Sequence, residues 1–96
     1  MNLDQALQII KSNKNKIQEL FSVEKIGVFG STARNNAATN SDLDIYVEFK
    51  EKDADNVLGL MVYLDELFKT KIDMVYKHKY NNPSLIKNIQ KEVIYG

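Results

Sequence analysis

The sequence predicts an α/β (α+β) domain in which helices flank a small mixed sheet of three strands. Apolar and polar residues alternate over 43–49, which is typical of a strand. Apolar residues at helical spacing precede and follow that segment. Residues 43–76 read as a strand, a helix and a further strand, and such a crossover joins parallel strands. The expected order is helix, strand, turn, strand, helix, strand, helix.

The first expected element is a helix over residues 3–20, because apolar residues recur there at steps of three and four or their multiples. The polar stretch 11–16, KSNKNK, is a poor helix former and favours fraying or a break within it. A short strand is expected at 25–29, KIGVF, and this strand runs directly into Gly30.

A turn and a loop separate this strand from the next one. Ser31 is a candidate cap for one helical turn over 31–35, and the composition of 36–41, NAATNS, is typical of a loop. Alternation in the strand at 43–49 places two sets of side chains on opposite faces, Leu43, Ile45, Val47 and Phe49 on one and Asp44, Tyr46 and Glu48 on the other.

The remaining elements are a charged connection at 50–55, a helix at 56–68, a strand at 71–76 and a closing helix at about 83–94. Pro83 suits the first turn of the closing helix, and Asn82 is a candidate cap before it. We detect no repeat, linker or low-complexity segment, so a single domain spanning 1–96 is expected.

The composition is that of an ordinary globular protein. Hydrophobic residues make up 44% of the chain, and 13 basic residues balance 13 acidic ones. This composition argues against a disordered chain, and the zero net charge argues against a surface built to bind nucleic acid directly. The absence of cysteine excludes disulfides and thiolate zinc sites. With no signal-peptide pattern and no long apolar run, a soluble cytoplasmic protein without membrane contact is expected.

The acidic residues are concentrated in the middle of the chain. Residues 42–66 hold eight acidic side chains against two lysines, whereas basic residues predominate on both sides. A solvated acidic loop and helix would explain this concentration. The alternative is that some of these carboxylates hold cations.

Gly30 and Ser31 lie at a strand-to-helix turn. Glycine lets a ligand approach the backbone closely, and the unpaired N–H groups of a helix start suit phosphate. A plain turn is the alternative for this dipeptide taken alone.

Three aspartates complete the candidate site. Alternation puts Asp42 and Asp44 on one face at the head of a strand, where two neighbouring carboxylates repel each other unless a cation such as Mg²⁺ binds them. Asp73 interrupts the apolar strand IDMV and needs a partner, which is either Lys69 or Lys71 or the same metal. If the strands at 43–49 and 71–76 are neighbours, all three carboxylates can converge on one face.

The segment VFGSTARNNAATNSDLDIYVEF resembles the signature of the DNA polymerase beta-like nucleotidyltransferase superfamily, and in its short form the chain is similar to the minimal nucleotidyltransferases, or MNT proteins. The resemblance covers most of the chain. It implies the minimal nucleotidyltransferase fold and Mg²⁺-dependent transfer of AMP from ATP. It also implies an antitoxin whose partner is a HEPN-domain ribonuclease toxin, with a tyrosine of that toxin as acceptor.

Carried over by position, the resemblance assigns a role to each residue of the signature. Gly30 and Ser31 would bind the nucleotide triphosphate. Asp42 and Asp44 would hold the metal ions, of which two are expected. Asp73 would hold the catalytic metal and help to activate the acceptor hydroxyl. Two metals can clamp the attacking and leaving oxygens of an in-line displacement.

Two further positions match the family signature and one departs from it. Arg34 matches an arginine that often follows the Gly-Ser turn and would bind the nucleotide; a surface salt bridge is its alternative role. Ser41 matches a serine before the first aspartate and would cap or orient the loop at the nucleotide. Asn35 stands where a glycine is common, and asparagine tolerates the left-handed conformation better than most residues.

Other functions stay open at this stage. The chain could be a binding-only antitoxin that masks its toxin sterically, although the intact Gly-Ser and three aspartates argue against a vestigial site. It could be a free-standing nucleotidyltransferase for a small molecule, although 96 residues leave little room for a built-in acceptor site. His78 and the lysines of 77–91 are expected on the surface. The tyrosines are expected to serve in packing rather than as acceptors.

Overall fold

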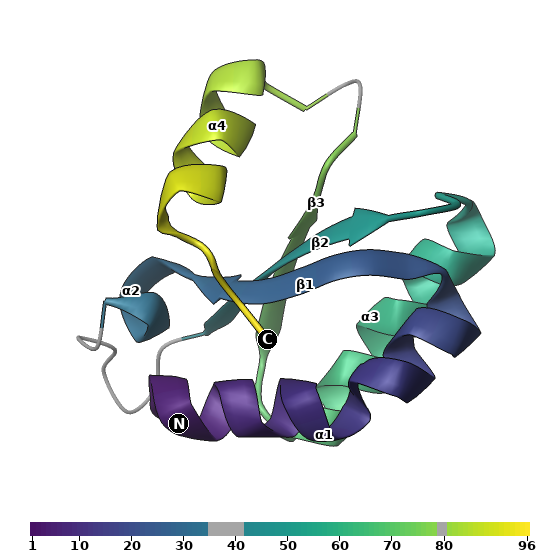
Figure 1. Ribbon diagram of the computed structural model, residues 1–96, viewed down its shortest axis with the longest axis horizontal. Helices are drawn as coiled ribbons and strands as arrows, with labels where there is room; N and C mark the ends of the chain where they lie inside the picture. Colours follow the sequence, from purple (N-terminus) through teal and green to yellow (C-terminus); the bar gives the residue numbers. More distant parts are fainter. Residues whose placement is uncertain (35–41, 79–80) are drawn as a thin grey trace.

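The computed structural model describes residues 1–34, 42–78 and 81–96. Helices and strands alternate along the chain (Figure 1). They are α1 (Leu3–Phe21), β1 (Val23–Phe29), α2 (Gly30–Ala33), β2 (Leu43–Phe49), α3 (Ala54–Phe68), β3 (Ile72–Tyr76), α4 (Pro83–Glu92) and β4 (Ile94–Tyr95).

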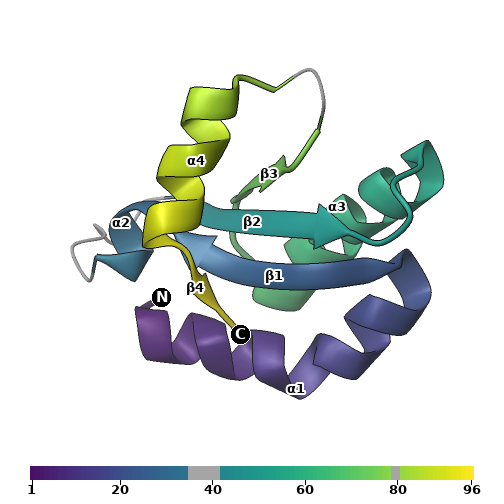
Figure 2. The same ribbon diagram turned by 45° about the horizontal axis from the view of Figure 1, so that its top comes forward.

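The strands form one mixed sheet in the order β3-β2-β1-β4. β2 and β3 are parallel, as the crossover through α3 predicts, whereas β1 runs antiparallel to β2 (Figure 2). The expectation of three strands is wrong, because β4 adds a fourth strand antiparallel to β1. A two-residue strand is too short to produce an alternating pattern in the sequence.

Gly27 allows β4 to lie close to β1. A Cβ at this position would come within 2.6 Å of the Ile94 carbonyl oxygen and 2.9 Å of the Tyr95 Cα. The Gly96 N–H donates to the Ile26 carbonyl oxygen at 3.0 Å, which extends the pairing by one residue. The end of the chain is therefore fastened along the edge of β1.

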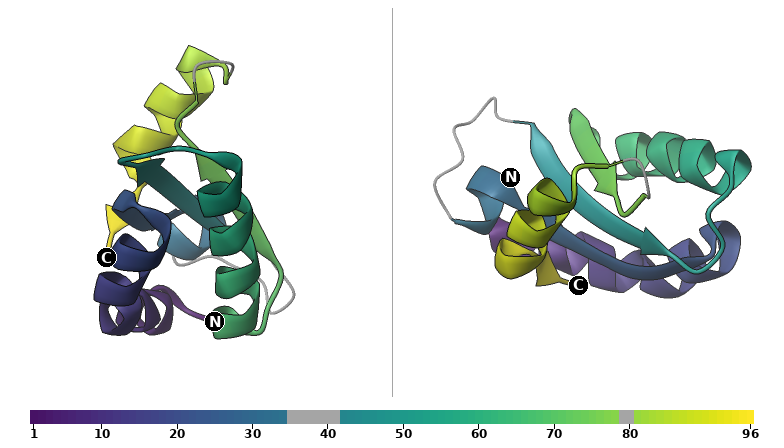
Figure 3. Two further views of the ribbon diagram at one scale, coloured as in Figure 1. Left: turned by 90° about the vertical axis from the view of Figure 1, so that its right-hand side faces the viewer. Right: turned by 90° about the horizontal axis from the view of Figure 1, so that it is seen from above.

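The larger hydrophobic core lies between one face of the sheet and the helices α1 and α3 (Figure 3). It is made of buried residues from those two helices and from β1 and β2, namely Ala6, Ile10, Ile17, Val23, Ile26, Val28, Leu43, Ile45, Val47, Leu60, Leu64 and Phe68. These include the apolar face that alternation predicts for β2. The two helices also meet through the rings of Phe21 and Tyr63, whose centroids are 5.4 Å apart.

α4 covers part of the opposite face. Its Ile86 and Ile89 pack on Tyr46, which is fully buried. The Tyr46 hydroxyl donates to Glu48 Oε2 at 3.0 Å and accepts from Gln90 at 3.2 Å, and burial raises the pKa of Tyr46 to about 12. This face, which α4 only partly covers, carries the candidate site.

Several element boundaries differ from those expected. α1 continues through the polar stretch without a break, because Ile10 and Ile17 are both buried and Asn13 donates to the Ile9 carbonyl oxygen at 2.9 Å. α3 begins two residues early because the Asp53 side chain caps it by accepting from the Asn56 N–H. Across the described ranges, no helix is long and apolar enough to cross a membrane.

Candidate active site

The candidate site lies where β1 ends and β2 begins. Because these strands are antiparallel, Phe29 pairs with Asp44, and the turn after β1 lies beside the carboxylate at the head of β2. The parallel pairing of β2 with β3 then places Asp73 directly opposite Asp44. Asp44 lies two residues before Tyr46 in β2, and Asp73 lies two residues before Val75 in β3. Tyr46 and Val75 belong to the core under α4, so both aspartates lie on the face that α4 partly covers. The sheet thus joins the Gly-Ser turn to two of the predicted aspartates.

Gly30 is required at its position for two separate reasons. Its φ of +72° lies in the left-handed region that other residues rarely adopt. A Cβ at Gly30 would also collide with the Asp44 carboxylate. The backbone therefore approaches Asp44 as closely as a chain without a side chain allows. The approach of a ligand to the backbone at this turn stays a prediction.

The surroundings of Asp44 disfavour its ionised form. Burial raises the pKa of Asp44, and the negative charges of Asp73, Asp42 and Glu92 raise it further, while Arg34 opposes them. The order of these causes means that partial desolvation matters most and like charge comes next. A divalent cation would relieve both costs, and carboxylate oxygens are the ligands that Mg²⁺ prefers. The chemistry of these side chains therefore fits a magnesium site.

The carboxylates do not form a ready-made cage. Over the part of the chain that the structure describes, no three acidic or histidine side chains are arranged so that they could hold a metal ion. Asp42 is instead paired with Lys71, whose Nζ lies 3.8 Å from its Oδ2. Asp73 pairs with Asp44 across the sheet and the charge of Asp42 raises the pKa of Asp44, while convergence of all three carboxylates on one ligand stays a prediction. A bound cation would have to draw the side chains together.

Asp73 differs from its description in the sequence. The prediction treated it as an acid inside an apolar strand that needs a partner, but its side chain is exposed. β3 is an edge strand of the described sheet, so water can hydrate the exposed Asp73 carboxylate. Lys71, one of the two lysines considered for that role, pairs with Asp42. Exposure leaves Asp73 accessible to a ligand.

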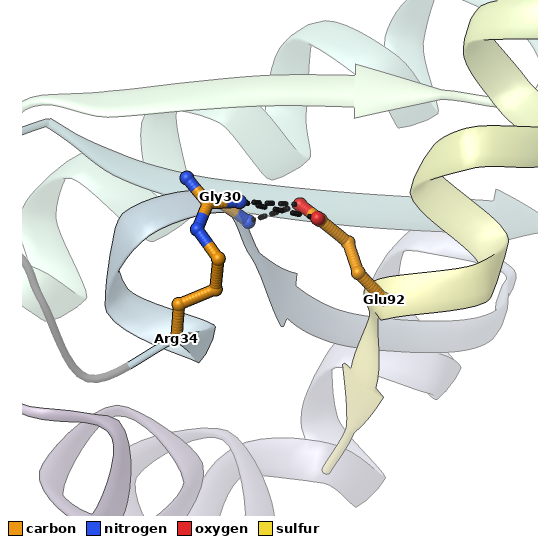
Figure 4. A network of polar contacts seen from close by, with 3 residues as sticks. All are labelled: Gly30, Arg34 and Glu92. Atoms are coloured by element: carbon orange, nitrogen blue, oxygen red, sulfur yellow. Dashed lines mark hydrogen bonds and ion pairs between the residues drawn. The ribbon is translucent and has the colours of Figure 1, made fainter.

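Arg34 contacts Glu92, a residue that the sequence did not point to as part of the site. Its Nη1 donates to both carboxylate oxygens of Glu92, at 3.3 and 3.1 Å, and Gly30 N–H donates to Glu92 Oε1 at 2.8 Å (Figure 4). The salt bridge considered as an alternative for Arg34 is therefore present. Glu92 closes α4, and no local pattern links it to Gly30, which is 62 residues away.

The two serines of the predicted site have different outcomes. Ser31 does not cap α2: the helix begins at Gly30, Phe29 is the cap residue, and no side chain caps the helix. The left-handed Gly30 starts the turn one residue earlier than expected. Ser41 and Asn35 lie outside the described residues.

The tyrosines and His78 were considered as packing or surface residues, and the structure shows where they lie. Tyr46, Tyr63 and Tyr76 each pack within the fold or contact another ring, as expected for packing residues. Tyr95 is exposed, contrary to that expectation, and Tyr80 lies outside the described residues. His78 is half-buried with its ring edge-on to Tyr76 at 5.7 Å, so it is less exposed than predicted.

Comparison with protein families gives a match over nearly the whole chain. Residues 8–96 match the family described as polymerase beta, nucleotidyltransferase. The protein adenylyltransferase MntA of Thermococcus cleftensis is 33% identical over 96 residues, which cover 99% of this chain and 96% of that protein.

Solved structures share the fold. A candidate minimal nucleotidyltransferase superposes with a TM-score of 0.75 at 26% identity, covering 98% of this chain and 95% of its own. The tri-AMPylated HEPN toxin of Shewanella oneidensis in complex with MNT antitoxin also gives a match, with a TM-score of 0.57 at 21% identity. That match covers 88% of this chain and 69% of the other. At this identity it shows the fold alone.

Proposed function

The chain belongs to the polymerase beta nucleotidyltransferase family and is a nucleotidyltransferase, and from this premise we propose that it moves AMP from ATP to a hydroxyl group of a partner protein. The observation that carries the proposal is the position of the Gly30 backbone against Asp44, with Asp42 and Asp73 on the same face. That arrangement offers a backbone N–H and an Arg34 guanidinium for phosphate beside carboxylates for a cation.

The aspartates would hold Mg²⁺, which when bound neutralises phosphate charge and favours displacement in line. Gly30 and Arg34 would orient the triphosphate through their N–H donors, with Ser31 beside them in α2. Asp73 would accept the proton of the attacking hydroxyl while the hydroxyl oxygen bonds to the α-phosphorus. The bond from the α-phosphorus to the bridging oxygen then breaks, and pyrophosphate leaves. Positioning and charge neutralisation supply most of the rate.

The acceptor in this proposal is a tyrosine of a cognate HEPN-domain toxin, and the protein acts as its antitoxin. Support comes from the relative named protein adenylyltransferase and from the complex of an AMPylated HEPN toxin with an MNT antitoxin. Exposed apolar side chains at Leu58, Met61 and Val62 give α3 a surface suited to a protein partner.

Intact mass measurement tests this function directly. The purified protein is incubated with Mg²⁺, ATP and a HEPN-domain protein from the same organism. We expect an AMP-sized mass gain on the partner. In Asp44→Asn the rate of this AMP transfer should fall by a factor of about 100 or more. Asp4→Asn, the same chemical change on an exposed residue of α1, is the matched control and keeps full activity.

The thermal midpoint of Asp44→Asn separates loss of chemistry from loss of fold. A variant that is inactive and at least as stable as the wild type supports the assignment. A tight complex and a neutralised toxin without any mass gain would replace the proposal with a binding-only antitoxin.

A further inference from the structure

Glu92 occupies two hydrogen-bond donors of the candidate site. Its Oε1 accepts from the Gly30 N–H at 2.8 Å, and Arg34 Nη1 donates to both of its oxygens (Figure 4). The contact is a charge-assisted one, because a carboxylate meets a guanidinium and a backbone amide. The side chains of Arg34 and Glu92 are 54% and 37% exposed, so a ligand from solvent can reach them.

These are the donors that a nucleotide phosphate would need. A carboxylate and a phosphate present similar anionic oxygens to an N–H group. A backbone N–H has one proton to donate, so the Gly30 amide cannot serve Glu92 and a phosphate oxygen fully at the same time. One anion must leave before the other binds in that place.

The fold holds Glu92 at these donors. Glu92 ends α4, and the chain then turns through extended Val93 into β4, which pairs with β1 at Gly27 and Val28. The tight fit of Gly27 against β4 fixes the start of this tether. A tethered side chain acts at a high effective concentration, so a single carboxylate can compete with a free ligand.

We propose that Glu92 sets the nucleotide affinity of this enzyme by competing, within the molecule, with a nucleotide phosphate for the Gly30 N–H and the Arg34 guanidinium. The proposal rests on the proposed function, since it takes the nucleotide to bind at this turn. Glu92 is thus a specificity-determining residue: it resists weak anions and yields to a ligand that brings several phosphate charges with a cation. Removing its charge frees the donors and also removes a repulsive charge beside Asp44.

Calorimetric titration with Mg²⁺ and adenylyl imidodiphosphate, a non-hydrolysable ATP analogue, tests the competition. Glu92→Gln keeps the shape of the side chain and loses its charge. We expect it to bind the analogue about tenfold more tightly than the wild type, because a charged hydrogen bond is replaced by a weaker neutral one. Glu66→Gln removes an equal charge from exposed α3 and leaves the affinity unchanged. A purely structural role for Glu92 would not raise affinity.

The Arg34→Gln background shows whether the effect passes through the proposed donors. There the gain from Glu92→Gln should shrink to about twofold or less, since one shared donor group is gone. Glu92→Asp keeps the charge but shortens the side chain, and we expect an intermediate affinity. This second variant answers the question if Glu92→Gln does not fold, which its thermal midpoint reveals.

The outcomes separate this inference from the proposed function. Equal or weaker binding by Glu92→Gln, with AMP transfer intact in the wild type, overturns the competition and leaves the proposed function standing. A gain in affinity that persists undiminished without Arg34 also overturns it. Absence of analogue binding in the wild type and in both Glu92 variants removes both proposals together.

Discussion

The surroundings of the Asp44 carboxylate affect both the candidate site and the stability of the fold. It is partly buried, it faces Asp73 across the parallel pair, and it leaves no room for a side chain at Gly30. Its burial and the negative charge of Asp73 both disfavour the ionised form of Asp44 in the absence of a cation. The ionised Asp44 carboxylate therefore lowers the stability of the fold.

This cost predicts a dependence of stability on pH. Because the pKa of Asp44 is raised in the folded state, the wild type is penalised as pH rises through that pKa. Asp44→Asn should therefore be more stable than the wild type at pH 7. The difference should vanish below the ordinary aspartate pKa of 3.8. Urea unfolding at several pH values without divalent cations measures it, and a variant less stable at pH 7 would contradict the assignment.

At this scale the sequence predicts much of the site and misses one residue. Alternation places Asp42 and Asp44 on one face, and the crossover brings Asp73 beside them. Glu92 could not be predicted, because its partner Gly30 is 62 residues away and contact between them depends on how α4 crosses the sheet. The exposure of Asp73 follows from its place on an edge strand, which the sequence does not reveal.

Among the described elements, β4 is the shortest, and it pairs only with β1. It pairs with β1 where Gly27 has no side chain, and the helix that carries Glu92 leads directly into it. Its two residues gave no signal in the sequence. The continuity of α1 was also missed, because burial of Ile10 and Ile17 outweighs the poor propensity of the polar residues between them.

Gly27→Ala should detach β4 from β1. The added Cβ would lie under 3 Å from backbone atoms of Ile94 and Tyr95, so the strand has to move away. Hydrogen exchange of the Gly96 N–H, now bonded to the Ile26 carbonyl oxygen, should become at least about tenfold faster. Amides of α1 serve as the internal control. Unchanged exchange at Gly96 would mean that β1 and β4 adapt without separating.

The whole molecule has two unequal apolar layers. The larger joins α1 and α3 to one face of the sheet, and the smaller lies under α4 on the other (Figures 1 and 3). The sequence predicts that helices flank the sheet, and this is confirmed. It does not say which helix covers which face, and for that reason alternation alone could not show that Tyr46 is buried.

The larger layer should determine global stability. Ile10 is fully buried in it, so Ile10→Ala should lower the free energy of unfolding by about 2–5 kcal/mol. Leu58 is 60% exposed, and Leu58→Ala should change that free energy by no more than about 0.5 kcal/mol. Chemical denaturation of the two variants beside the wild type tests the difference. Equal losses would show that burial in the larger core does not determine the cost of truncating a side chain.

The hydrogen bond between Gly30 and Glu92 joins a residue made early in synthesis to one made late. A ribosome makes Gly30 first, then the aspartates of β2 and β3, and reaches Glu92 62 residues after Gly30. Contacts between such distant residues close late, because the intervening chain must first lose its freedom. During synthesis the turn at Gly30 and the carboxylates of Asp44 and Asp73 therefore exist before the side chain that hydrogen-bonds to Gly30. The Gly30–Glu92 hydrogen bond can form only after the last residue of α4 has been added.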